Sequence, residues 1–227
     1  GRMEKEWGIG RWIADPAGKY EIEKLRNVGF KVQRFVHDLL RPLAKHQAAN
    51  PPATLGPDSM ARLAALDPLK LPPVPSGTRL GPCVGGVGNV IGIGLNYADH
   101  AAEAGLKVPG EPIVFNKHAG ALSGPNDDGW LPPGALKLDW EVELGVVIGQ
   151  RAFHVGEGEA LSHVAGYCLL NDVSERAYQI EHEGQWVKGK SYPTHCPIGP
   201  WLVTPDELGD PQDVELWLEV NGTRRQN

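Results

Sequence analysis

Long apolar runs, basic charge and paired cysteines are all scarce in this sequence of 227 residues. No stretch approaches the roughly 18 apolar residues of a membrane-spanning helix, and no apolar signal-peptide segment follows the first residues. The formal net charge of −6 provides no basic surface for nucleic acid or anionic lipid. Three cysteines, Cys83, Cys168 and Cys196, lie far apart, and their odd number argues against a disulfide framework. We expect a cytoplasmic protein that binds neither nucleic acid nor membrane.

Familiar nucleotide and hydrolase motifs are also missing. The glycine-rich run that begins at Gly85 has Ile91 where a dinucleotide fingerprint needs its third glycine, and the run precedes a strand candidate. A turn or β-bulge is the better interpretation. The sequence contains no P-loop and no GxSxG elbow, and the His182 region lacks the second histidine of HExxH because Trp186 stands there.

Glycine and proline are abundant, with 29 and 20 residues, and they separate short apolar segments. This distribution is typical of a β-rich fold with many turns. Ser174 has the chemistry of a helix N-cap, with an acid directly after it. We expect helices at 98–104 and 174–182, and strands at 87–95, 113–115, 140–148, 164–170, 201–203 and 214–220.

The first eighty residues have a different sequence pattern from the rest of the chain. Apolar positions recur at helical spacing between Tyr20 and His46, which predicts an amphipathic helix. A short helix follows at 60–66, and a proline-rich connector leads to a boundary at 76–84. We therefore expect a small N-terminal domain and linker over residues 1–80 and a second domain over residues 81–227.

Three acids in the second domain are candidate metal ligands. Side chains alternate along a strand, so Glu141 and Glu143 point to one face, about 6.5–7 Å apart. A solvated strand face is the alternative, but the apolar residues that follow favour an interior strand, where paired carboxylates need a cation or a proton. Asp172 stands at the end of another apolar strand. Three carboxylates predict Mg²⁺, Mn²⁺ or Ca²⁺ rather than structural zinc.

Two further groups could carry chemistry. His100 and Glu103 are three residues apart and share one face of a short helix, where a carboxylate can orient an imidazole as a water-activating base. A surface ion pair is the alternative. Lys188 and Lys190 lie in a glycine-containing segment that we expect to be a loop, and a buried lysine there could hold an anionic substrate.

Taken in order, these segments resemble the fumarylacetoacetate hydrolase family. The likeness covers roughly residues 62–227 and is densest in five stretches: IGIGLNYADHAAEAG (91–105), EPIVFNKHAGALSGPND (111–127), LDWEVELGVVIG (138–149), VAGYCLLNDVSERAYQ (164–179) and GQWVKGKS (184–191). The resemblance implies an α+β, β-rich fold, a mixed β-roll preceded by a small variable N-terminal domain. It also implies a homodimer with one Mg²⁺ or Mn²⁺, for which Ca²⁺ can substitute.

The resemblance further implies roles for individual residues. Glu141, Glu143 and Asp172 match the metal-binding acids, and His100 with Glu103 matches the pair that activates water. Lys190 matches a lysine that contacts the substrate or its enolate. Tyr97, Arg176 and Gln179 match positions around the substrate. The implied reaction is hydrolysis of the C3–C4 bond of a 2,4-diketo acid, which yields pyruvate and a second carboxylic acid.

Within the family, the sequence most resembles those of bacterial members that act on 2,4-diketo-3-deoxy sugar acids, often labelled ureidoglycolate lyase-like. Decarboxylation or isomerisation of a related keto acid through the same metal-bound enolate is a second possibility. Two departures stand out. Pro193 occupies the common Asp position of the KSxDTFGP segment, and relatives continue beyond Asn227 with a helix, strands and a substrate-binding loop. A truncated, catalytically silent homologue that binds metal or a partner is the third alternative.

Overall fold

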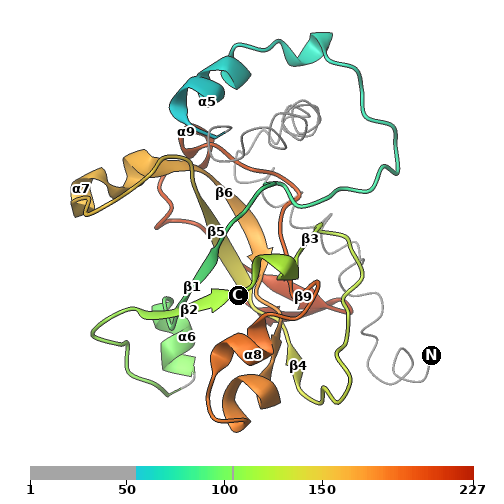
Figure 1. The fold of residues 1–227 in the computed structure, drawn as a ribbon, viewed down its shortest axis with the longest axis vertical. Helices are drawn as coiled ribbons and strands as arrows, with labels where there is room; N and C mark the ends of the chain where they lie inside the picture. Colours follow the sequence, from blue (N-terminus) through green and yellow to red (C-terminus); the bar gives the residue numbers. More distant parts are fainter. Residues whose placement is uncertain (1–54, 104) are drawn as a thin grey trace.

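The computed structural model describes residues 55–103 and 105–227, without the side chains of Asp99 and Glu103 (Figure 1). The helix expected between Tyr20 and His46 lies outside these residues, and so does most of the expected N-terminal domain. The part that is described combines short strands with short helices. None of its helices has the length and apolar character needed to cross a membrane.

The longest strands form one antiparallel ladder in the middle of the molecule (Figure 1). β5 (Val142–Ile148) pairs with β6 (Val164–Asn171), and Val142 lies opposite Asn171. β4 (Leu138–Asp139) pairs in the same way with β7 (Ser174–Glu175). The register is identical on both sides of the short break, so the two pairs form one interrupted ladder.

The expected strand over 140–148 is therefore partly wrong, because Trp140 and Glu141 lie in the break and not in a strand. Hydrogen bonds nevertheless continue the pairing there: the Asp172 N–H donates to the Glu141 carbonyl at 2.9 Å, and the Glu141 N–H donates to the Asn171 side chain at 3.1 Å. The polypeptide stays extended without forming regular ladder bonds. This break is where the candidate site lies.

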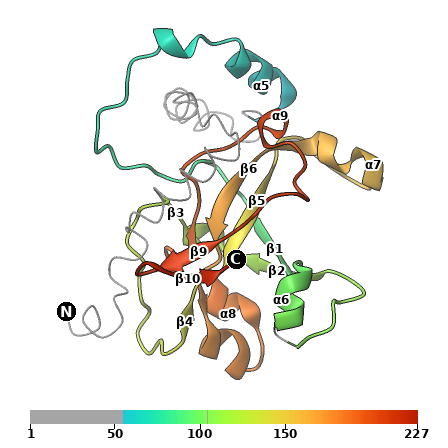
Figure 2. The same cartoon turned by 180° about the vertical axis from the view of Figure 1, so that it is seen from behind.

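Three smaller sheets surround the central ladder, and Figure 2 shows one of them, β9 with β10, from behind. Two are antiparallel and one is parallel, so the described sheets are of mixed type, as expected. Asn221 and Gly222, with φ of 52° and 74°, form the two-residue turn of a hairpin. The pairs are β1 (Val90–Gly94) with β2 (Ile113–Lys117), β3 (Leu122–Ser123) with β8 (Cys196–Pro197), and β9 (Leu218–Val220) with β10 (Thr223–Gln226).

Two of the short helices are at the expected places, α5 (Pro57–Ala64) and α6 (Ala98–Glu103). The expected helix at 174–182 begins later, because Ser174 belongs to β7 and a π-helix, η5, spans Ala177–Glu181. Residues 201–203 contribute only a single bridge, between Val203 and Tyr167. The other α-helices of the described residues are α7 (Glu157–Ala160), α8 (Trp186–Lys190) and α9 (Pro205–Leu208).

Ser174 is not the N-cap of that helix, and the reason is the ladder. Pairing with β4 holds Ser174 and Glu175 extended, and the buried Glu175 carboxylate accepts the N–H of Tyr178 at 2.7 Å. Its other oxygen accepts the N–H groups of Leu136 and Lys137 at 2.9 and 2.7 Å. One buried carboxylate thus satisfies three backbone donors and joins η5 to the segment before β4.

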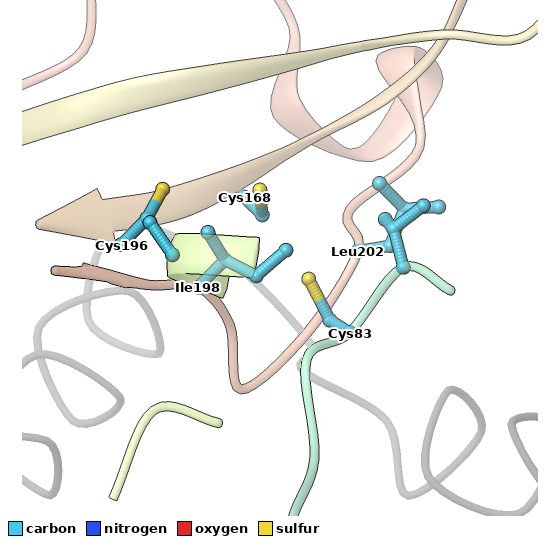
Figure 3. Packing of buried hydrophobic residues seen from close by; sticks show 7 residues of the cluster. Cys83, Cys168, Cys196, Ile198 and Leu202 are labelled. Carbon is cyan, nitrogen blue, oxygen red and sulfur yellow. The ribbon is translucent and has the colours of Figure 1, made fainter. Parts of the chain in front are cut away.

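The hydrophobic core lies against β6 (Figure 3). Cys83, Cys168 and Cys196 are buried there beside Ile198 and Leu202, and all three thiols are free. The hydrogen bond of the Cys83 thiol with Cys168, together with burial, raises the pKa of Cys83. Burial raises the pKa of Cys196 to about 12. Cys83 and Cys196 therefore act as small apolar core residues and not as nucleophiles.

Candidate metal centre

The break in the central ladder brings two of the predicted metal ligands face to face. The common register on both sides of the break places Glu141 directly opposite Asp172. Opposed residues of an antiparallel pair project to the same face of the sheet. Glu143 lies two residues after Glu141 and shares that face. Glu141 is outside β5, but its charge acts on Glu143, so the two glutamates lie close together.

Basic side chains occupy the oxygens of these acids. The Lys190 ammonium donates to Glu141 Oε2 at 2.8 Å and to Asp172 Oδ2 at 2.7 Å. The Lys117 ammonium donates to Asp172 Oδ1 at 2.5 Å and to the Val173 carbonyl at 3.1 Å. Burial of Asp172 acts to raise its pKa, but the two ammonium groups outweigh burial and hold the pKa below its usual value.

The expectation that Lys190 lies in a loop is wrong. Lys190 is the last residue of α8, and its side chain is only 2% exposed. Gly189 makes this placement possible. A Cβ at position 189 would lie 2.3 Å from the Glu175 carbonyl oxygen and 2.7 Å from the Gln179 nitrogen. Because that Cβ is absent, α8 packs directly on the backbone of β7 and η5. This packing places the Lys190 ammonium in contact with Glu141 and Asp172.

Arg176 joins the acids to the π-helix. Its guanidinium contacts Asp139 Oδ2 through Nε at 2.8 Å and Nη2 at 2.7 Å, and Glu141 Oε1 through Nη1 at 2.6 Å. Nη1 also donates to Gln179 Oε1 at 2.9 Å. The structure therefore brings the predicted pocket residues Arg176 and Gln179 to the same site as Glu141. Their role toward a substrate stays a prediction.

Glu143 and Tyr97 form the opposite side of the site. Burial, together with the nearby Glu141 carboxylate, raises the pKa of Glu143 to about 7. The Tyr97 hydroxyl hydrogen-bonds to Glu143 and accepts the Leu144 N–H at 3.3 Å. Burial and the charge of Glu143 raise the pKa of the Tyr97 phenol. Within the described residues Glu143 has no ion-pair partner, so its charge is the least compensated of the three acids.

His100 lies on α6, three residues after Tyr97, and is exposed. Among the described residues no side chain forms a hydrogen bond or an ion pair with its ring. The side chain of Glu103, its predicted partner, is outside what the structure describes. The water-activating pair thus remains a prediction for these two residues, whereas the Tyr97 contact shows that the start of α6 lies beside Glu143.

The three acids offer the hard oxygen donors that Mg²⁺ and Mn²⁺ prefer. Glu141 and Asp172 already share one cation, the Lys190 ammonium, and the half-buried Glu143 has none among the described residues. The donor set therefore fits a divalent cation in chemistry and in charge. In their present positions, however, no three His, Cys, Asp or Glu side chains of the described residues lie close enough together to hold a metal ion.

Three residues of the site escaped the sequence reasoning, namely Lys117, Asp139 and Ser174. Lys117 is the buried last residue of β2, and a lysine directly after the apolar residues of a strand was the available signal. Asp139 and Ser174 are a cross-strand pair, and the Ser174 hydroxyl lies 3.3 Å from Glu141 Oε1. No local sequence pattern predicts such a pair, because the two residues are distant in sequence.

The described residues thus define a β-rich protein with a buried centre of acidic and basic side chains. The model of the fumarylacetoacetate hydrolase C-terminal family matches residues 89–227. A Burkholderia multivorans protein named "Putative hydrolase" is 57% identical over 188 residues, which are 83% of this chain and 67% of that protein. The chain therefore belongs to the fumarylacetoacetate hydrolase family.

Solved structures agree with this assignment. A fumarylacetoacetate hydrolase from Exiguobacterium antarcticum is 36% identical with a TM-score of 0.60, over 71% of this chain and 58% of that one. A 5-carboxymethyl-2-hydroxymuconate delta-isomerase from Mycobacterium smegmatis is 43% identical with a TM-score of 0.54, over 61% and 51% of the two chains. Family membership and these relatives support an enzyme.

Proposed function

We propose that this chain is part of a divalent-metal-dependent hydrolase that cleaves the C–C bond of a 2,4-diketo acid to pyruvate and a second carboxylic acid. The observation that carries the proposal is the pair Glu141 and Asp172, opposed across the broken ladder and sharing one buried cation. Such a pair is costly in a protein interior unless a cation is held between the acids. Glu143 is the third acid of the proposed site.

Mg²⁺ or Mn²⁺ held by Glu141, Glu143 and Asp172 would supply positive charge to the oxygens of a keto acid and of the enolate formed from it. The protein supplies the rest. Arg176 and Lys190 would supply positive charge for an anionic substrate, and Gln179 and Tyr97 would offer hydrogen-bonding groups beside them. This neutralisation of an acidic substrate is the part of the mechanism that the described residues support most directly.

His100 is the proposed general base. Its imidazole would take a proton from water, the resulting hydroxide would attack the C4 carbonyl, and cleavage of the C3–C4 bond would release the second acid. The electron pair of that bond would pass to the pyruvate enolate, which takes a proton at C3 to give pyruvate. Glu103 would orient His100, and Lys190 would stabilise the enolate charge.

The reaction is tested by following pyruvate release from a series of acylpyruvates with and without Mg²⁺ or Mn²⁺. His100→Ala is expected to keep metal binding and lose turnover by at least about 100-fold, as removal of a general base does. His154→Ala, at an exposed histidine between β5 and α7, is the matched control. Unchanged turnover in His100→Ala would exclude His100 as the base, and no metal-dependent pyruvate from any diketo acid would refute the hydrolase.

Isomerisation of a related unsaturated keto acid is the second candidate, and the observation that favours it is the 43% identity to a solved isomerase. Both reactions pass through an enolate and use the same positive groups. They differ in products, because isomerisation releases no second molecule. Analysis of products by mass therefore separates them: two acids indicate hydrolysis, and a single product of unchanged mass indicates isomerisation.

A further inference from the structure

Lys190 stands between the two opposed acids. Its ammonium donates to one oxygen of Glu141 at 2.8 Å and to one oxygen of Asp172 at 2.7 Å, and it lies 5.0 Å from the centre of the Phe115 ring. The two carboxylates are its hydrogen-bond partners among the described residues. A buried ammonium held by two carboxylates and an aromatic face neutralises the charge of the pair.

The remaining oxygens of the two acids are also engaged. Glu141 Oε1 contacts the Arg176 guanidinium at 2.6 Å, and Asp172 Oδ1 accepts from Lys117 at 2.5 Å. All four carboxylate oxygens thus have a cationic partner. A divalent cation needs oxygens within roughly 2.0–2.6 Å. A cation that binds Glu141 and Asp172 together therefore competes with these basic side chains for the oxygens.

The three basic side chains differ in how firmly they are held elsewhere. Arg176 has two contacts to Asp139 and one to Gln179 besides its contact to Glu141. Lys117 is also bonded to the Val173 carbonyl at 3.1 Å. Lys190 has no such second anchor in the described part of the chain. Its release alone would free one oxygen on each acid at the same time.

We propose that Lys190 is an exchangeable counter-ion: it neutralises Glu141 and Asp172 when no metal is bound, and an incoming divalent cation displaces its ammonium. The displaced ammonium remains buried beside the acids, free to pair with an anionic substrate. Lys190 therefore weakens metal binding and becomes available to the substrate only once the metal is in place. This inference rests on the proposed metal-dependent function.

The test compares the affinity for Mn²⁺, measured by calorimetric titration and by the Mn²⁺ resonance signal, in the wild type, Lys190→Met and Lys117→Met. Both variants remove one positive charge beside Asp172, but only Lys190→Met frees oxygens on both acids. We expect Lys190→Met to bind Mn²⁺ at least tenfold more tightly than Lys117→Met does, and more tightly than the wild type. An equal or smaller gain for Lys190→Met would overturn the counter-ion role.

Loss of Lys190 removes one of the positive charges that neutralise the two opposed carboxylates. Lys190→Gln therefore serves as a second, polar variant, and circular dichroism checks that each variant is folded. Lys190→Met and Lys190→Gln are both expected to melt at a lower temperature than the wild type without metal. Both should also show a larger Mn²⁺-induced rise in melting temperature than the wild type. A lysine that is merely structural would lower the melting temperature without enlarging that rise.

The two proposals fail differently. Wild type that binds Mn²⁺ together with Lys190 variants that bind it no better would overturn the counter-ion role and leave the metal-dependent function standing. Absence of Mn²⁺ binding in the wild type and in both Lys190 variants would overturn both. Weak binding in the wild type with tight binding in Lys190→Met supports both.

Discussion

The buried imidazole of His195 should make the stability of this protein depend on pH. His195 is 1% exposed, and its Nε2 lies 3.1 Å from the Trp130 carbonyl oxygen. Burial lowers the pKa of His195 from 6.5 to about 4, and the Lys117 ammonium adds to this. The Trp130 carbonyl and the Asp172 carboxylate act in the opposite direction but do not compensate for burial.

The sign follows from proton binding. Between pH 6.5 and 4 the unfolded chain takes up a proton at His195 and the folded protein does not, so the free energy of unfolding falls as the pH falls through this window. Each pH unit corresponds to about 1.4 kcal/mol, so the window corresponds to a loss of about 3 kcal/mol. Above pH 6.5 this contribution is fully present, and below pH 4 the loss is complete.

Urea unfolding of the wild type and of His195→Phe at several pH values between 7.5 and 4 measures the effect. Other titrating groups contribute equally to both proteins, so the difference between the two curves isolates His195. That difference should shift by about 3 kcal/mol in favour of His195→Phe as the pH falls. His195→Gln, which also cannot titrate but keeps a polar group near Trp130, should behave like His195→Phe. Parallel curves would refute the reasoning.

Two further predictions concern the packing that holds the site. Glu175→Gln should lower the free energy of unfolding by about 1.5–3 kcal/mol, because the amide replaces one charged acceptor of backbone N–H groups by a donor; a loss in urea unfolding below about 0.5 kcal/mol would contradict this. Gly189→Ala should cost about 1–3 kcal/mol, because its Cβ would meet the backbone of Glu175 and Gln179. Gly158→Ala, where a Cβ meets nothing within 4 Å, is its control, and equal stabilities of the two variants would show that α8 shifts freely.

Local patterns in the sequence predict much of the described secondary structure. Apolar runs bounded by turn residues locate β1, β2, β5 and β6, and Asn221-Gly222 locates the last hairpin. These features can be read from the sequence because side-chain alternation and turn conformation depend on neighbouring residues only. The shared face of Glu141 and Glu143 has the same origin.

Where the sequence prediction failed, a long-range contact decides the structure. Ser174 looked like a helix cap, but pairing with Asp139 across the ladder makes it a strand residue. Lys190 looked like a loop lysine, but the close approach of Gly189 to Glu175 turns its segment into a short buried helix. In both cases the competing local preference is smaller than the gain from ladder pairing or burial.

The sequence by itself determined which acids belong to the candidate site, through strand periodicity and the family resemblance. Only the tertiary structure decided that Glu141 faces Asp172, that Lys117 and Lys190 share the Asp172 carboxylate, and that Arg176 holds the other side of Glu141. Register between strands is fixed by burial and by contacts between residues far apart in the chain. A local pattern can therefore nominate charged residues, but their neutralising partners emerge only when the strands pair.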